Sequence, residues 1–532
     1  MASCARCEKI LGAADREDVY PLCQSSPAEY CSLCQELAGM NDEIERVTSI
    51  LHDLFDKRDK LRGQLNNTHP SIIDRLPVEV AAKIFVSYVS DIESWKVSPL
   101  KLGAISRRWR QIAWSTPALW SDIAFYFHSN HVTQSHLEIV EEWLARVANH
   151  PLTIRLLGYN VRESDPHLHQ FYPLIDLLKR HCNQWYDLYV ALPTSLIVRL
   201  GGPTCVARNL HLLSIGPNDN TELILPTFSH IAPENFKSFG PLSDTIDLDW
   251  SRATDINITS IYVDQILLIL RQSPNLLKCC FDDIDARNVS APTTAYQHVT
   301  HSSLKSLRIR MASEAGMGLF LNNVTFPTLR DLRIRDWASH PGPANMLRSL
   351  IIRSGSALKT MRLETLNVTA EELIALTEVT RSLETLRIYP RRDAGDGQLE
   401  AFYRALQAHL PSNSSSGPVR EVPLLPLLRS FEWKGHAAFP WDSILAFLVP
   451  LSADGEVSRR PLERIEIVCR GFFIDSPEVR LSDNIISELS PFQDEVEFHF
   501  KVREDLGDEL DLWFMTRDYY RGNLGEGGSD TY

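Results

Sequence analysis

The chain has 532 residues, of which 44% are hydrophobic and 23% charged, and its formal net charge is −14 at pH 7. This length exceeds one ordinary domain, and the apolar content is high enough for a real core in two or three units or in one long repeat array. Acidic residues outnumber basic ones, which argues against nucleic-acid binding as the main activity, because phosphate binding depends on clustered Lys and Arg.

The first segment, residues 1–36, contains two Cys-x-x-Cys pairs but lacks the continuous apolar core of a secretory signal. The pairs are Cys4 with Cys7 and Cys31 with Cys34, and 23 residues separate the inner members, a gap wider than typical zinc spacing. We expect reduced cysteines with no cofactor or metal, and a four-thiolate zinc site is the alternative. No run of about 18 apolar residues occurs, so we expect an intracellular protein, cytoplasmic or nuclear, without membrane association.

Residues 37–66 carry an apolar residue at alternating steps of three and four, which is the heptad pattern of a coiled coil. Arg58 interrupts this pattern. The pattern predicts a helix that either folds back on its own chain or associates weakly with a second copy. The heptad residues are Leu37, Met40, Ile44, Val47, Leu51, Leu54, Arg58, Leu61 and Leu65.

Residues 70–125 form a second helical block. Pro70 and Pro77 each suit the first turn of a helix, where the missing N–H is not needed. Apolar residues then recur at three- and four-residue intervals from Val80 to Tyr88 and again from Leu102 to Ala113, which predicts two amphipathic helices. Each helix therefore has one apolar side that needs a partner.

The order of these residues resembles the F-box. The block contains Leu76-Pro77-x-Glu-Val, then Ile84-Phe85, and then Ile105-Ser106-Arg107-Arg108-Trp109-Arg110, and it ends in Leu119-Trp120. Ser106 stands where many members have cysteine. The resemblance implies docking onto a Skp-type linker protein, which in turn holds a cullin. The residues that it assigns to linker binding are Leu76, Pro77, Val80, Ile84, Phe85, Leu102, Ile105, Arg108 and Trp109.

Residues 135–500 show an internal repeat. Residues 303–309, 328–334 and 382–388 are three nearly interchangeable strings of the form Leu-x-x-Leu-x-Ile, and several spacings between such strings are 25 to 29 residues, as in leucine-rich repeats. Helical patterns lie between them, for example at 264–271, 344–353 and 370–379. We therefore predict an α/β fold: a coiled-coil helix and a three-helix F-box, followed by a leucine-rich-repeat-like solenoid with a parallel sheet. Residues 501–532 would be an acidic tail.

Within the repeat strings, the residue between the second leucine and the isoleucine faces away from the core. This residue is an arginine at four positions, Arg308, Arg333, Arg362 and Arg387, which predicts a column of like charges on neighbouring strands. An acidic or phosphorylated client would relieve the repulsion. The alternative is an ordinary solvated surface whose charge is neutralised locally by Asp331, Asp336, Glu364 and Glu384.

The sequence offers no enzyme motif: Gly-x-Ser-x-Gly, a phosphate-binding Gly-rich loop ending in Lys, and His-Glu-x-x-His are all missing. The resemblance implies a non-catalytic substrate receptor of an SCF-type (Skp/cullin/F-box) ubiquitin ligase, whose repeat domain binds a protein client. The alternative is a leucine-rich-repeat scaffold that is not attached to a ligase.

Overall fold

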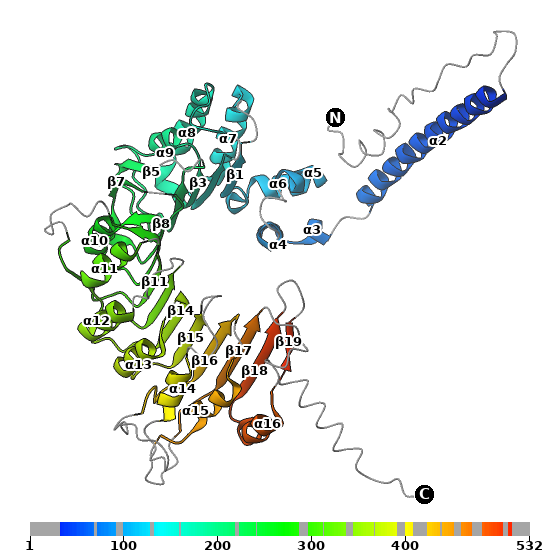
Figure 1. Ribbon diagram of the computed structural model, residues 1–532. Helices are drawn as coiled ribbons and strands as arrows, with labels where there is room; N and C mark the ends of the chain where they lie inside the picture. The colour runs from blue at the N-terminus through cyan, green and yellow to red at the C-terminus, as the bar shows by residue number, and fades with distance from the viewer. Residues whose placement is uncertain are drawn as a thin grey trace, which may run out of the picture. The chain divides into compact units, whose positions relative to one another are not determined.

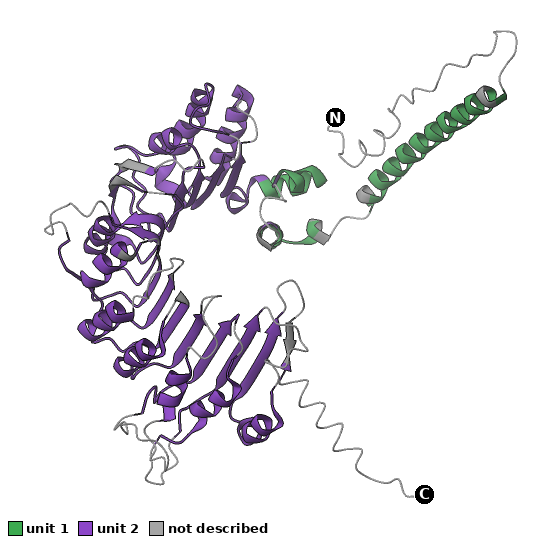
Figure 2. Cartoon of the chain, viewed as in Figure 1, with its two compact units in different colours: residues 1–88, 100–113 green, residues 89–99, 114–532 purple. Residues whose placement is uncertain are grey.

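The computed structural model describes most of the chain, with gaps. The described residues are 32–68, 72–91, 99–127, 132–158, 161–218, 223–240, 242–286, 296–311, 313–336, 344–366, 368–390, 399–407, 423–436, 439–451, 459–470, 481–503 and 509–512. The chain divides into two compact units (Figure 2). Unit 1 comprises residues 1–88 and 100–113, and unit 2 comprises residues 89–99 and 114–532.

Unit 1 is helical. Its longest element is α2 (Ser32–Thr68), which contains the whole predicted heptad pattern. Four shorter helices follow: α3 (Ile72–Arg75), α4 (Val78–Asp91), α5 (Pro99–Ile105) and α6 (Arg107–Trp114). Pro77 directly precedes α4, as expected for a residue that has no N–H to leave unpaired there.

Unit 2 is built on one large sheet (Figure 1). Fourteen strands pair in parallel in the order β1-β2-β3-β4-β6-β8-β9-β11-β13-β14-β15-β16-β17-β18, and β19 closes the sheet in the antiparallel direction. The strands are β1 (Asp122–Tyr126), β2 (Leu152–Leu157), β3 (Trp185–Ala191), β4 (Leu212–Gly216), β6 (Asn235–Ser238), β8 (Asp255–Tyr262), β9 (Lys278–Asp285), β11 (Ser306–Met311), β13 (Asp331–Asp336), β14 (Thr360–Leu366), β15 (Thr385–Pro390), β16 (Ser430–Gly435), β17 (Arg464–Arg470), β18 (Glu497–Arg503) and β19 (Glu509–Asp511).

Helices connect most of the successive strands of this sheet. They are α7 (Gln134–Val147), α8 (Tyr172–Lys179), α9 (Thr194–Leu200), α10 (Val263–Gln272), α11 (Glu314–Asn322), α12 (Ala344–Ser354), α13 (Ala370–Val379), α14 (Glu400–Gln407), α15 (Leu445–Leu448) and α16 (Asp483–Leu489). Two small parallel pairs accompany them: β5 (Leu223–Phe228) with β7 (Leu242–Leu248), and β10 (Val299–Thr300) with β12 (Val324–Thr325). In Figure 1 the strands of unit 2 line the inner side of an arc, and α10 to α13 lie on its outer side.

The repeat strings hold the core of this unit. Leu304, Leu307 and Ile309 of the first strict string are all at most 1% exposed, and the equivalent residues of the other two strings are also buried. Each strand and helix pair leaves an apolar face that only the next pair can cover, which explains the continuous sheet. The predicted α/β class with a repeat-like parallel sheet is confirmed.

The sheet extends beyond the predicted repeat region at both ends. Strand β1 begins within the block predicted at 70–125, yet it pairs in parallel with β2. The Trp120 side chain is fully buried in this end of unit 2 and packs edge-to-face against Trp114 and Trp143. At the other end, β18 runs past residue 500 and β19 pairs with it, so the part of 501–532 that the structure describes belongs to the sheet.

Helix α13 begins with a reciprocal cap formed by Thr369 and Glu372. The backbone N–H of Glu372 donates to Thr369 Oγ1 at 3.2 Å, and the backbone N–H of Thr369 donates to Glu372 Oε2 at 2.9 Å. We expect Thr369→Ala to lower the free energy of unfolding by about 1 kcal/mol, because the substitution removes the side-chain acceptor. Urea denaturation measures this change, and Ser302→Ala in an exposed loop is the control. Equal stability of both variants would contradict the assignment of the cap.

Candidate functional site

The apolar residues of α4 form two rows. Ala81 and Phe85 are 0% and 1% exposed and face the interior of unit 1, whereas Val80, Ile84 and Tyr88 are 42–48% exposed. Both rows follow the four-residue spacing that keeps side chains on one side of a helix. The second row is therefore a solvent-facing apolar stripe.

The inner row holds the helices of unit 1 together. The ring of Phe85 packs on the ring of Trp109, with centroids 4.7 Å apart and planes inclined by 38°. At the junction of α5 and α6, Ser106 Oγ accepts a hydrogen bond from the backbone N–H of Trp109 at 3.1 Å, and Arg110 Nε donates to the Gly103 carbonyl at 2.8 Å. These bonds fix the turn between the two helices, and Ser106 caps α6.

The nine residues assigned to linker binding do not share one face. Phe85 and Leu102 are buried, at 1% and 3% exposure, so they hold unit 1 together and cannot contact a partner directly. Leu76 and Trp109 are half-buried. Pro77, Val80, Ile84, Ile105 and Arg108 are exposed. Phe85 and Leu102 thus lie inside unit 1, because the apolar side of the block is wide enough to serve both an interior and an outer face. The assignment of the nine residues to linker binding stays a prediction.

Two further large apolar side chains of unit 1, both on α5, are exposed. Ile105 at the end of α5 is 61% exposed, and Leu100 at its start is 48% exposed. We call Val80, Ile84, Tyr88, Leu100 and Ile105 the apolar patch of unit 1. Large exposed apolar areas typically mark a binding surface.

The four predicted arginines lie side by side in unit 2. Arg308 pairs in register with Arg333, Arg333 with Arg362, and Arg362 with Arg387, on β11, β13, β14 and β15. The row continues with Glu432 on β16 and beyond. The predicted column of arginines is therefore present on neighbouring strands.

Glu364 lies among three guanidinium groups, two of which belong to this column. Its carboxylate, on β14, is 6% exposed and lies 2.7 Å from Arg333 Nη2 and 3.8 Å from Arg335 Nε, and it also contacts Arg362 Nε. One negative charge thus serves three positive ones, and the surroundings of Glu364 keep a positive excess. The alternative interpretation predicts that Glu364 and Glu384 neutralise the arginine column. Glu364 does pair with column arginines, but Glu384 pairs with Lys359.

A second buried carboxylate, Glu432, follows the arginines. It lies 2.9 Å from Arg387 Nε and 2.5 Å from Lys434 Nζ, and it accepts a hydrogen bond from the Tyr389 hydroxyl at 2.5 Å. Burial and this carboxylate together raise the pKa of Tyr389. The guanidinium of Arg362 stacks over the Tyr389 ring at 4.6 Å from the centroid, so aromatic and acidic neighbours hold the arginine side chains in fixed positions.

Arg308 differs from the other three arginines. It is exposed, and within the residues that the structure describes no carboxylate forms an ion pair with it. Cys280 on β9 lies opposite Arg308 in the sheet. Burial and nearby Asp282 raise the pKa of Cys280 to about 11, whereas the positive charge of Arg308 acts to lower this pKa. Arg308 is therefore the member of the column best placed to bind an added anion.

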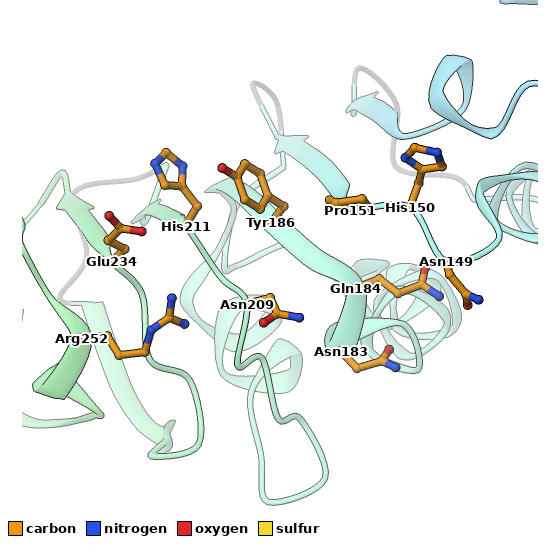
Figure 3. Close-up of a pocket in the computed structure, with 10 residues that line it drawn as sticks. All are labelled: Asn149, His150, Pro151, Asn183, Gln184, Tyr186, Asn209, His211, Glu234 and Arg252. Carbon is orange, nitrogen blue, oxygen red and sulfur yellow. The ribbon is translucent and has the colours of Figure 1, made fainter. Parts of the chain in front are cut away.

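A polar groove runs along the edge where several strands of the sheet begin (Figure 3). Its volume is about 520 Å³, and its lining comes from the residues that precede or start β2, β3, β4, β6 and β8. The lining residues are Asn149, His150, Pro151, Asn183, Gln184, Tyr186, Asn209, His211, Glu234 and Arg252.

Hydrogen bonds already occupy the ring of His211 in this groove. Its Nδ1 lies 3.0 Å from Asp187 Oδ1, and its Nε2 lies 3.1 Å from Asn235 Nδ2. The amide nitrogen of Asn235 can only donate, so Nε2 accepts and Nδ1–H donates to Asp187. The Tyr186 ring stacks on His211 with centroids 5.0 Å apart. This histidine consequently has no lone pair available to act as a general base.

The predicted metal alternative falls outside what the structure describes. Cys4, Cys7 and Cys31 lie outside the described residues, as does the side chain of Cys34. Among the described residues, no cluster of three or more His, Cys, Asp or Glu side chains is arranged to hold a metal ion. The described helices also include none that is both long enough and apolar enough to cross a bilayer.

Comparison with known proteins gives no assignment. No family model matches the sequence, and no curated protein matches it significantly.

Proposed function

We propose that this chain is the substrate-receptor subunit of an SCF-type ubiquitin ligase, with unit 1 binding a Skp-type linker protein and unit 2 binding a protein client. The observation that carries the proposal is the apolar patch of unit 1, which stands in an F-box-like sequence ahead of a long repeat array. In this proposal the chain catalyses nothing itself and acts by bringing a client to a cullin-based ligase.

The exposure of unit 1 supports the linker-binding role. Residues such as Ile84 and Ile105 are 43% and 61% exposed although they are large and apolar, and a partner that covered them would remove this surface from water. The contact between the buried Phe85 and the half-buried Trp109 would keep the helices in a fixed arrangement. A docking surface that is already ordered loses less conformational entropy on binding.

The positive excess around the arginine column supports the client-binding role. The whole chain has a net charge of −14, yet three arginines share Glu364, and Arg308 has no carboxylate partner among the described residues. A phosphorylated or acidic segment of a client would bind guanidinium groups through charge-assisted hydrogen bonds. The repeat sheet would hold these groups in a fixed row.

Affinity purification tests the ligase assignment. The tagged full-length chain, expressed in cells and isolated under mild conditions, is expected to bring down a Skp-type linker and a cullin, as identified by mass spectrometry. If neither protein is recovered while other proteins are, the chain is a repeat scaffold without a ligase.

Arg308 gives the most direct test of client binding. Reversing the charge of Arg333 or Arg362 would place a second carboxylate beside the buried Glu364. Arg308 is exposed and forms no ion pair with a carboxylate among the described residues, so its charge can be reversed without this conflict. We expect Arg308→Glu to weaken binding of phosphorylated peptides by about tenfold, because at least one charge-assisted hydrogen bond is lost. Binding of the full chain to matched phosphorylated and unphosphorylated degenerate peptide libraries measures this change.

Lys305 supplies the matched control. It is also exposed and lies just before β11, outside the arginine column. Lys305→Glu makes the same change in net charge and should leave peptide binding within twofold. An equal loss of peptide affinity in both variants would show that net charge alone causes the effect. No loss of affinity in either variant would show that the arginine column does not bind the client.

A further inference from the structure

Helix α2 exposes its heptad seam along most of its length. From Met40 to Leu65 the apolar seam residues are 47–63% exposed, and the flanking Ile50 and Phe55 are 46% and 43% exposed. The seam extends from Leu37 to Leu65, about 43 Å at 1.5 Å per residue. A helix in water draws most of its stability from packing of its apolar side, so this seam needs a cover.

We propose that the cover is the α2 helix of a second copy of this chain, paired with the first in the antiparallel direction. The proposal goes beyond the receptor function and depends on the charges that flank the seam. In heptad letters, Leu37, Ile44, Leu51, Arg58 and Leu65 occupy position a, and Met40, Val47, Leu54 and Leu61 occupy position d.

A parallel pair would bring like charges together. Arg58 would face Arg58 of the second copy inside the seam, because a residues face each other in a parallel pair. Lys57, at position g, would meet Arg62 of the second copy, at position e. Each helix would thus add three positive charges to the same end of the pair, where they repel one another.

An antiparallel pair removes both conflicts. When Leu37 packs against Leu61 of the second copy and Ile44 packs against Leu54, the seam overlaps along its full length. Arg58 then lies beside Met40 and no longer faces its own copy. The flanking g positions place Glu43 next to Lys57 of the second copy, and the twofold symmetry produces this opposite-charge contact twice.

The apolar flanking residues also fit this arrangement. Ile50 lies at the centre of the g row, so it meets Ile50 of the second copy across the twofold axis. Within one helix Glu43 already pairs with Arg46 at 2.5 Å, and both side chains are about 60% exposed, so Glu43 remains accessible to a second partner. The charges therefore favour the antiparallel dimer, and the seam overlap and the contact at Ile50 are compatible with it.

Charge reversal at Lys57 distinguishes the two orientations. In the antiparallel dimer Lys57→Glu places two acids together at each end, and we expect the dimer Kd to rise about tenfold, since exposed ion pairs each contribute up to about 1 kcal/mol. The double variant Glu43→Lys/Lys57→Glu restores opposite charges and should recover the original Kd. In a parallel dimer Lys57→Glu would face Arg62 and tighten association.

The measurement is sedimentation equilibrium of the full-length chain across a range of concentrations. Lys60→Glu, at the outward-facing position c, makes the same charge change and should shift the Kd by less than twofold. A dimer weakened by Lys57→Glu and recovered by the double variant supports the proposal. A monomer at all concentrations, a larger oligomer, or a dimer tightened by Lys57→Glu overturns it.

Discussion

Replacing Ile84 and Ile105 together by aspartate is expected to weaken binding of the Skp-type linker by more than about 100-fold. Both side chains are large, apolar and exposed in unit 1. Burying each at a docking surface contributes about 1.5–3 kcal/mol, and every 1.4 kcal/mol changes Kd about tenfold. A carboxylate placed in the same surface would also lose its hydration. Titration calorimetry with the purified linker measures the change.

The controls separate docking from folding. Ile139→Asp on α7 replaces an isoleucine that is 55% exposed outside unit 1, and linker binding should not change. The double variant should keep its unfolding transition, because exposed substitutions usually change stability by less than about 0.5 kcal/mol. Phe85→Ala, in contrast, should lower the stability of unit 1 by about 3 kcal/mol. Full linker affinity in the double variant would place the docking surface elsewhere.

Replacing Arg460 by methionine is expected to lower the free energy of unfolding by about 3–5 kcal/mol. The Arg460 side chain is buried at 4% exposure, and its nitrogens donate to the carbonyls of Leu406, Leu424, Ala446 and Phe447 at 3.0–3.3 Å. Burial lowers its pKa to about 10, so it is still charged at neutral pH. Methionine fills similar space but leaves these buried acceptors without their donor.

Arg460 joins parts of unit 2 that are distant in sequence. The accepting carbonyls come from α14, from α15 and from the segment before β16. One guanidinium thus takes the place of the water molecules that these carbonyls would otherwise bind. Arg429→Met is the control, because its side chain is 51% exposed and pairs with Glu463 at the surface. Chemical denaturation followed by circular dichroism measures both variants. A loss below about 1 kcal/mol for Arg460→Met would show that other donors or water satisfy the carbonyls.

The repeat strings made much of unit 2 predictable from the sequence. Period-two alternation in residues 303–309, 328–334 and 382–388 identified β11, β13 and β15, and the helix predicted at 370–379 is α13. The same alternation predicted that the arginines share a row. Near-identical strings pair in register because each must put the same leucines into the same core layer.

Other elements lacked a clear local signal. Helix α11 was not predicted, because its sequence contains Gly316 and Gly318, and glycine disfavours a helix interior. Glu432 was not predicted as a partner of Arg387, although its string aligns with the others, because a long insertion separates β15 from β16 and breaks the repeat spacing. Strands β1 and β19 become part of the sheet only through pairing with neighbours, which the sequence does not record.

The predicted docking residues illustrate a different limit. Helical periodicity placed Val80, Ala81, Ile84 and Phe85 on one apolar side of α4, but an apolar arc of this width serves two surfaces. Side-chain size does not decide between them, since the large Phe85 is buried and the large Ile84 is exposed. Only the position of Trp109, which packs on Phe85, determines which row faces the interior.

Direct binding of the purified full-length chain to a purified Skp-type linker tests the central claim, because the receptor role requires this contact. Titration calorimetry should give a one-to-one complex with a Kd below about 1 μM, corresponding to about −8 kcal/mol. The heat capacity of binding should be negative, since the apolar patch would leave water. Absence of detectable binding at concentrations of about 100 μM, with both proteins folded, would contradict the assignment of unit 1 as a linker-binding module.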